Sequence, residues 1–106
     1  MDHKLYAMIG LAQKAGKVVS GEDGSARDIK TGKSMLVVIA KDSSGNTKKQ
    51  FKNMCVHRNI PFIEFGTKEQ LGKFVGKDYR AVLSIRDSGF AKSISVLYNE
   101  KLSGGE

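Results

Sequence analysis

The sequence contains one cysteine, one proline and no tryptophan. A single cysteine excludes an internal disulfide and a zinc site built on several thiolates. A chain with four methionines and no paired thiols is typical of a reducing compartment, so we expect a cytoplasmic protein. The densest apolar run, residues 35–40, is far shorter than the roughly 20 residues of a membrane helix. The N-terminal residues form an amphipathic segment, and we expect no targeting segment and no membrane contact.

The chain is also poor in arrangements of residues that carry chemistry. His3 and His57 are far apart, and neither has a cysteine or carboxylate at metal-ligand spacing. Cys55 is expected to pack in the core rather than act as a nucleophile. Residues 21–24 match neither a Walker-type phosphate loop nor a dinucleotide fingerprint. Three aspartates lie near predicted strand ends, where catalytic carboxylates and turn residues are both common: Asp42, Asp78 and Asp87. We therefore expect no enzyme, no cofactor, no metal and no small-molecule substrate.

Positive charge is abundant. Eighteen Lys and Arg residues against eleven Asp and Glu residues give a formal net charge of +7 and a pI near 9.6. Basic domains of this size usually bind a polyanion, most often nucleic acid. The alternative is a well-solvated surface with no such partner.

Helical and strand patterns alternate along the 106 residues. Apolar spacing predicts helices over residues 3–15, 24–31 and 47–58, a short helix after Thr67, and a last helix that begins at Ser88 or Gly89. Strands are predicted at 17–19, 35–40, 60–65 and 79–85, and the apolar strand 35–40 should be buried on both faces. This alternation predicts one domain, residues 1–106 with a core of about 3–100, built as a three-layer α/β/α sandwich.

Several residues mark the ends of the helices. Ser44 or Asn46 is expected to cap the third helix, and Asn59 to end it in a left-handed conformation. Thr67 should cap the fourth helix, with Gln70 as the second half of a capping box. These signals fix where the connections between the elements lie.

Residues 19–27 predict a strand, a glycine turn and the start of a helix. Such a turn directs backbone N–H groups and the positive end of the helix dipole outward. This geometry suits an anion such as a phosphate, or a base edge.

Basic residues gather in three of the connections. The groups are Lys14, Lys17, Arg27 and Lys30 around the glycine turn, Lys41, Lys48, Lys49 and Lys52 after the strand 35–40, and Lys77 and Arg80 before the last strand. At one edge of a sheet they would form a composite surface for phosphates. Tyr79 is expected either to stack on an unpaired base or to anchor the start of the strand.

Three blocks of the sequence resemble the kink-turn RNA-binding ribosomal protein superfamily of archaeal large-subunit protein seven-Ae and eukaryotic protein thirty-e. They are TGKSMLVVIA (31–40), LGKFVGKDYR (71–80) and IRDSGFAKSI (85–94). Size, charge and the segment 87–91 are similar to its bacterial YlxQ-like branch. The resemblance covers roughly residues 5–97. It implies a four-stranded mixed sheet and an RNA-binding face made of Gly21–Arg27 with Lys30, Lys41–Lys48, and Gly76–Arg80.

The resemblance further implies binding to a kink-turn, which is a sharply bent RNA duplex with tandem sheared G·A pairs. The turn pattern of the family is Gly-x-Asn-Glu-x-x-Lys or Gly-x-Lys-Gln-x-x-Lys. In this chain Gly21 matches the glycine of the pattern, and Arg27 occupies the position of its lysine. Asp23 occupies the position of Asn or Lys, and Gly24 the position of Glu or Gln. An aspartate accepts hydrogen bonds from guanine but donates none, and Gly24 removes a base-reading side chain altogether.

Together these observations predict a monomeric, non-enzymatic protein that binds kinked or internally looped structured RNA, with ribosomal RNA the expected partner. Gly21 and Gly24 would let RNA approach the backbone, Asp23 would accept from a base edge, and Tyr79 would stack. The expected phosphate contacts are Arg27, Lys30, Lys41, Lys48, Lys77 and Arg80. Two alternatives stay open: a protein-interaction adaptor on the same sandwich, and an accessory domain of a separate RNA-modifying enzyme.

Overall fold

Four strands form one mixed sheet in the order β1–β4–β2–β3. They are β1 (Val18–Ser20), β2 (Leu36–Ile39), β3 (Phe62–Glu64) and β4 (Val82–Ile85). β4 is antiparallel to both β1 and β2, and β2 is parallel to β3. The ends of β1, β2 and β3 therefore lie at the same edge of the sheet as the start of β4. We call this the turn edge; the opposite edge holds the starts of β1, β2 and β3 and the end of β4.

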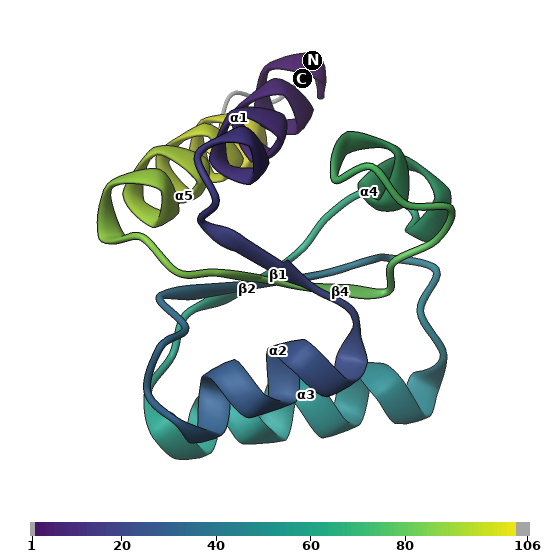
Figure 1. The fold of residues 1–106 in the computed structure, drawn as a ribbon, viewed down its shortest axis with the longest axis vertical. Coiled ribbons are helices and arrows are strands. Elements are labelled where there is room, and N and C mark those ends of the chain that lie inside the picture. Colours follow the sequence, from purple (N-terminus) through teal and green to yellow (C-terminus); the bar gives the residue numbers. More distant parts are fainter. Residues whose placement is uncertain (1, 104–106) are drawn as a thin grey trace.

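Five helices cover the two faces of this sheet in the computed structural model, which describes residues 2–103 (Figure 1). On one face lie α1 (His3–Lys14), α4 (Lys68–Phe74) and α5 (Ser88–Ser103); on the other lie α2 (Glu22–Lys30) and α3 (Gly45–Arg58). The predicted three-layer α/β/α sandwich is confirmed. Residues 1 and 104–106 lie outside the described part.

Each face of the sheet has its own apolar core. Leu5, Ile9 and Ile94 pack on the face under α1 and α5. Phe51 and Cys55 pack on the face under α2 and α3. β2 supplies residues to both cores, and all four of its residues are buried, as its continuous apolar run predicts. Cys55 is fully buried, and desolvation raises the pKa of its thiol to about 11, so its predicted role in packing is confirmed.

All elements except β4 lie within two residues of their predicted bounds, and two of the differences change the turn edge. The second helix begins at Glu22, not at residue 24, because Gly21 is its N-cap and the acidic pair at 22 and 23 forms its first turn. The fourth strand begins at Val82, not at residue 79, so residues 79–81 belong to the connection before it. The first difference shortens the β1–α2 turn to Gly21, and the second lengthens the α4–β4 connection.

Helix ends follow the local sequence signals closely. Ser44, not Asn46, caps α3, because its hydroxyl accepts a hydrogen bond from the Thr47 N–H at 3.1 Å. Thr67 caps α4 by accepting from the Gln70 N–H at 3.1 Å. Asn59 has a φ of 58° and ends α3 in the left-handed region, as predicted. Within residues 2–103, no helix has the length and hydrophobicity needed to cross a bilayer.

Candidate nucleic-acid interface

Gly21 ends β1 and begins α2 at the turn edge. Its φ of 97° and ψ of 162° lie in a region that is essentially restricted to glycine. The Gly21 N–H donates to the Val82 carbonyl at 2.9 Å, which holds the turn against the start of β4. The first helical residues, Glu22 and Asp23, are exposed beside it. Arg27 is also exposed and lies one turn further on, on the same helix face as Asp23.

Gly24 faces the sheet. A Cβ at this position would lie 2.6 Å from Cγ1 of Val19, which is closer than real side chains approach. Gly24 therefore allows the first turn of α2 to pack on β1. The Glu or Gln of the family pattern does not fit here unless Val19 moves.

Arg80 joins the third basic segment to the glycine turn. Its Nε donates to the Ser20 hydroxyl at 3.1 Å, across 60 residues of sequence. Its guanidinium also lies next to Gly21, where an added Cβ would be 3.8 Å from Nε. The Arg80 backbone N–H donates to the Lys68 carbonyl at 3.0 Å, so this one residue connects β1, α4 and the start of β4.

The connection from α4 to β4 (residues 75–81) lies directly on Gly72 of α4. A Cβ at Gly72 would be 2.7 Å from the Asp78 carbonyl oxygen and 2.9 Å from the Tyr79 nitrogen, so only glycine allows this approach. The Tyr79 side chain is 64% exposed and lies outside the strand. Its alternative role as a core anchor of β4 is therefore wrong, and its ring is free to stack.

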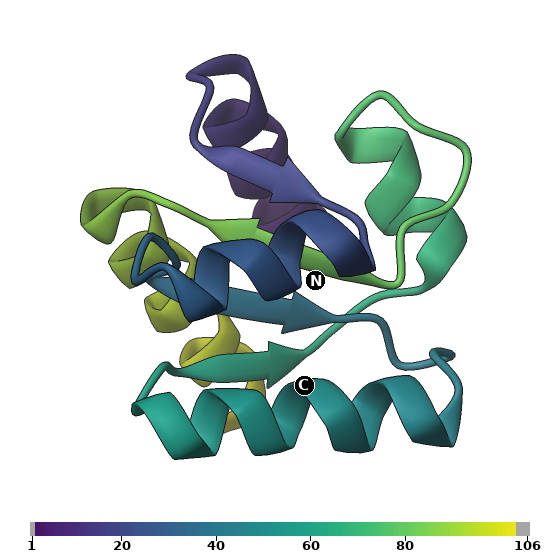
Figure 2. The ribbon, with the colours of Figure 1, turned by 60° about the horizontal axis from the view of Figure 1, so that its bottom comes forward.

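Several of these side chains surround one shallow depression of about 460 Å³ at the turn edge. Its lining residues are Gly21, Glu22, Asp23, Lys68, Tyr79, Arg80 and Ala81. Four of them were predicted as site residues from the sequence: Gly21, Asp23, Tyr79 and Arg80. The other three, Glu22, Lys68 and Ala81, were not. Lys68 reaches this place because α4 begins at the same edge (Figure 2).

The segment that follows β2 is fixed to its neighbours by side-chain hydrogen bonds. Asp42 Oδ1 accepts from the Lys68 N–H at 2.8 Å, and Thr47 donates through Oγ1 to Glu22 Oε2 at 3.4 Å. The Lys41 N–H donates to the Gly66 carbonyl at 2.8 Å. The Lys41 side chain is exposed at this edge, as is that of Lys77 in the α4–β4 connection. The three predicted segments thus meet in one place.

Of the predicted phosphate contacts, Lys48 is already ion-paired and Lys30 lies at the opposite edge. Lys48 is half-buried with its Nζ 3.6 Å from Glu64 Oε1, and Lys52 binds the other oxygen of the same carboxylate. The hydrogen bond from Lys52, together with the charge of Lys48, lowers the pKa of Glu64 despite its partial burial. Lys30 is exposed at the last residue of α2, so it lies at the opposite edge, where its carbonyl accepts from Arg58 Nη1 at 3.1 Å.

A buried polar cluster was not predicted from the sequence. Arg86 binds the buried carboxylate of Asp28 through two hydrogen bonds, Nε to Oδ2 at 2.9 Å and Nη2 to Oδ1 at 2.8 Å. Ser84 donates to the same carboxylate at 3.0 Å. Burial alone would raise the pKa of Asp28, but the Arg86 and Ser84 hydrogen bonds and the charge of Arg86 outweigh it, and the pKa is lowered. This cluster ties α2 to the end of β4, away from the depression.

The fold is a small α/β/α domain, in which a four-stranded mixed sheet lies between two layers of helices. A glycine-capped helix and charged loops lie at one edge of its sheet. The chain belongs to the Ribosomal protein L7Ae/L30e/S12e/Gadd45 family, whose model matches residues 3–95. The expected family is thus confirmed. Among residues 2–103, no group of three or more His, Cys, Asp or Glu side chains is placed to hold a metal ion.

The relatives cover three quarters or more of the chain. RNA-binding protein YlxQ of Bacillus subtilis is 38% identical over 87% of this chain and 93% of its own length. Large ribosomal subunit protein eL8 of Picrophilus torridus is 34% identical over 98% of this chain and 86% of its own length. Large ribosomal subunit protein eL30 of Trypanosoma brucei brucei is 35% identical over 76% of this chain and 79% of its own length.

Solved structures share the fold. A Bacillus halodurans protein of unknown function is 30% identical and superposes with a TM-score of 0.88, covering 92% of this chain and 98% of the other. A Giardia lamblia 15.5kD RNA binding protein has a TM-score of 0.79 over 93% of this chain and 85% of the other. At 18% identity, this second likeness concerns the fold alone.

Proposed function

We propose that this chain is a non-enzymatic, monomeric RNA-binding protein of the cytoplasm that recognises kinked or internally looped structured RNA, with ribosomal RNA as its partner. The observation that carries the proposal is the meeting of three segments, distant in sequence, around Gly21 at the turn edge. The names of the relatives support it, because YlxQ is called an RNA-binding protein, and eL8 and eL30 are large ribosomal subunit proteins.

The groups at the turn edge divide into two kinds of contact. Arg27, Lys41, Lys77 and Arg80 supply cations to phosphates, and such contacts position an RNA without reading its sequence. The depression holds a carboxylate from Asp23 and an exposed ring from Tyr79, which suit a base edge and a base face respectively. Lys68 adds a further cation beside them.

Charge at the turn edge favours shape recognition over tight non-specific binding. Residues 21–27, 41–48 and 76–80 together carry five basic and four acidic side chains. A nearly neutral surface gains little from a plain duplex, because non-specific affinity comes from neutralised phosphates. A kinked RNA that fits this surface gains several contacts at once, and a protein that binds only the kinked form shifts the RNA toward it.

The direct test is a gel-shift titration against a kink-turn RNA and an unkinked duplex of equal length. We expect tighter binding to the kink-turn at every salt concentration. Equal affinities would overturn shape recognition, and no binding to either RNA would favour the adaptor alternative. Crosslinking in cells, followed by sequencing of the bound RNA, tests the ribosomal assignment.

A further inference from the structure

The opposite edge carries most of the excess positive charge. The connections α1–β1, α2–β2, α3–β3 and β4–α5 meet there. Its basic side chains are Lys14, Lys17, Lys30, Lys33, Arg58 and Arg86. The acidic residues among and beside them are Asp28, which is buried under Arg86, and Asp87, whose carboxylate accepts from the Phe90 N–H at 2.8 Å. Six basic side chains are thus exposed at this edge, whereas its two carboxylates already accept hydrogen bonds, Asp28 from Arg86 and Asp87 from the Phe90 N–H.

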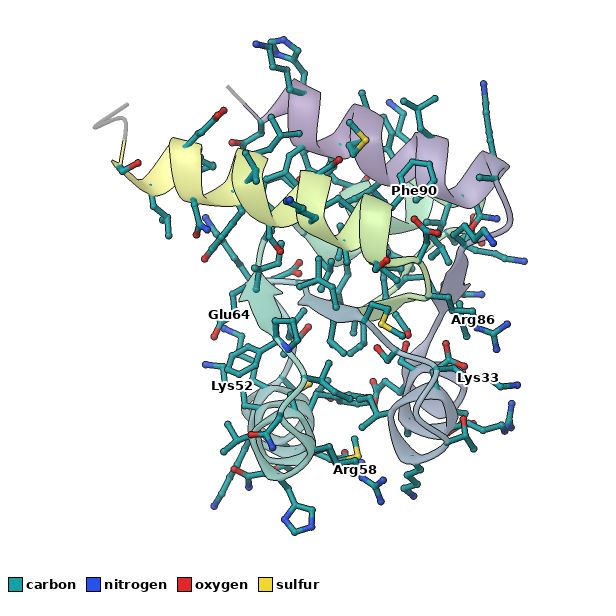
Figure 3. All side chains as sticks on the ribbon, turned by 90° about the vertical axis from the view of Figure 1, so that its left-hand side faces the viewer. Lys33, Lys52, Arg58, Glu64, Arg86 and Phe90 are labelled. Atoms are coloured by element: carbon teal, nitrogen blue, oxygen red, sulfur yellow. The ribbon has the colours of Figure 1, made fainter. Side chains whose placement is uncertain are left out.

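Hydrogen bonds hold these connections in fixed positions relative to one another. The Arg86 N–H donates to the Lys17 carbonyl at 2.8 Å, and the Arg58 guanidinium donates to the Lys30 carbonyl at 3.1 Å. The Lys33 N–H donates to the Asp28 carbonyl at 2.9 Å, in the same cluster that binds Arg86. In Figure 3, which faces this edge, Lys33 lies beside Arg86, and Arg58 lies between the ends of α2 and α3.

The cations at this edge are also free to bind a ligand. Within residues 2–103, no carboxylate lies within ion-pair distance of Lys14, Lys17, Lys30, Lys33 or Arg58. All five side chains are exposed. Arg58 and Lys30 line an open groove of about 610 Å³ between α2 and α3, with Met54 and Val56 as its apolar part.

We propose that the opposite edge is a second RNA-binding surface, which contacts the phosphate backbone of a separate RNA segment. Neighbouring strands lie about 4.8 Å apart, so an edge of four strands is about 15 Å wide and spans several phosphates. The basic residues come from all four connections and not from one helix, as a backbone-tracking surface requires. The protein then bridges two RNA segments, one at each edge of its sheet.

Phosphate is favoured over a base because cations outnumber the groups at this edge that can read a base, which are Asn53 and His57 in the groove. The large exposed hydrophobic side chains around the cations are Met35 and Val56, and the exposed tyrosine, Tyr79, lies at the turn edge. Lysine contacts to phosphate carry no sequence information and give binding that falls steeply with salt. The second surface therefore binds RNA duplexes without sequence preference. This binding at the opposite edge does not depend on whether the turn edge prefers kink-turns.

The test compares Lys17→Gln/Lys33→Gln with the matched control Lys4→Gln/Lys73→Gln. The control removes the same charge from exposed lysines of α1 and α4 away from this edge. For a plain RNA duplex, each phosphate contact contributes about 0.9 to the slope of log affinity against log salt. We expect the first variant to flatten that slope by about two and the control to leave it nearly unchanged. Equal effects of the two variants, or no effect of either, would overturn the proposal.

Bridging is measured on a surface that carries immobilised kink-turn RNA saturated with protein. A labelled plain duplex is then passed over it. We expect capture by the wild type and the control, and at least a tenfold loss of capture by Lys17→Gln/Lys33→Gln, although this variant is still held on the surface. Undiminished capture by that variant, or none by the wild type, would overturn bridging. Failure of the wild type to bind the immobilised RNA would contradict the turn-edge function alone, because the salt slope tests the opposite edge in solution.

Discussion

Arg80 donates a hydrogen bond through Nε to the hydroxyl of Ser20 at 3.1 Å, and this bond joins the last residues of β1 to the segment that leads into β4. The guanidinium is thereby held next to Gly21. In the proposed function, Arg80 combines a charge for phosphate with a contact that fixes the relative position of two segments of the RNA-binding surface. These two roles can be separated by mutation.

Arg80→Ala removes both roles, and Ser20→Ala removes only the positioning hydrogen bond. We expect Arg80→Ala to weaken kink-turn binding by about tenfold or more, the size of one charge-assisted hydrogen bond, and to flatten the salt slope by about one. Ser20→Ala should weaken kink-turn binding by a smaller factor and leave the slope unchanged. Lys77→Ala is the matched control, since it removes one exposed charge from the same connection. If Lys77→Ala is as harmful as Arg80→Ala, the position of Arg80 has no special importance.

Gly21→Ala tests the turn itself. The φ of 97° with ψ of 162° is nearly closed to alanine, and we expect the substitution to lower the free energy of unfolding by about 1–3 kcal/mol. Gly16→Ala is a control for backbone strain alone, because Gly16 has a φ of 74° and open space around it at the opposite edge. Urea unfolding should show both losses, and gel shifts should show weaker kink-turn binding for Gly21→Ala only. Normal kink-turn binding by a folded Gly21→Ala variant would show that the glycine turn is not part of the RNA interface.

Gly72→Ala tests how α4 supports the α4–β4 connection. The new Cβ would meet the Asp78 carbonyl oxygen at 2.7 Å, so the backbone of the connection must move, at a cost of about 1–3 kcal/mol in stability. Binding should weaken with it, because Tyr79 and Arg80 move too. In Gly10→Ala the nearest atom outside α1 is 3.6 Å away, and we expect this helix to gain about 0.5–1 kcal/mol. Unfolding curves and gel shifts of the two variants distinguish a specific clash from a general effect of alanine.

Local signals predicted the elements well because each depends on neighbouring residues. The buried run 36–39, the Thr67 cap and the left-handed Asn59 all follow from patterns a few residues long. The start of α2 was misplaced because residues 21–24 resemble a turn, whereas Gly21 alone makes the turn and the next three residues are helical.

Contacts between distant segments were beyond the reach of such patterns. The pairing of Asp28 with Arg86 joins residues 58 apart, and neither has a neighbour that indicates it. Lys30 was grouped with Arg27 by its place in the sequence, but nine helical residues carry it to the other edge of the sheet. The predicted convergence of three segments is observed for the residues next to strand ends, since the sheet topology brings those ends together.

The ionised Asp28 carboxylate makes the free energy of unfolding depend on pH. Its pKa is lowered in the folded state, so its contribution is fully present above the usual aspartate pKa of about 3.9 and is lost as the pH falls through the lower folded value. Asp28→Asn should lower the free energy of unfolding at neutral pH by about 2 kcal/mol, the cost of weakening a buried charge-assisted pair. The difference between wild type and variant should shrink below about pH 4. Urea unfolding across the pH range measures it, with exposed Asp78→Asn as the control. A constant difference would exclude the carboxylate charge as its cause.

Asp23→Asn tests base recognition at the depression. The carboxylate of Asp23 accepts hydrogen bonds but donates none, and it repels phosphate; an asparagine keeps the shape and adds two donors. One good base contact is worth about 1–3 kcal/mol, so we expect at least fivefold tighter binding to the kink-turn and, for an unkinked duplex, only the smaller gain that comes from losing the charge. Asp78→Asn removes the same charge nearby, but Asp78 does not line the depression, so it should strengthen binding to both RNAs alike. Parallel titrations of the two variants against the two RNAs separate base reading from general electrostatics. An equal gain for both RNAs with Asp23→Asn would show that Asp23 acts only through its charge.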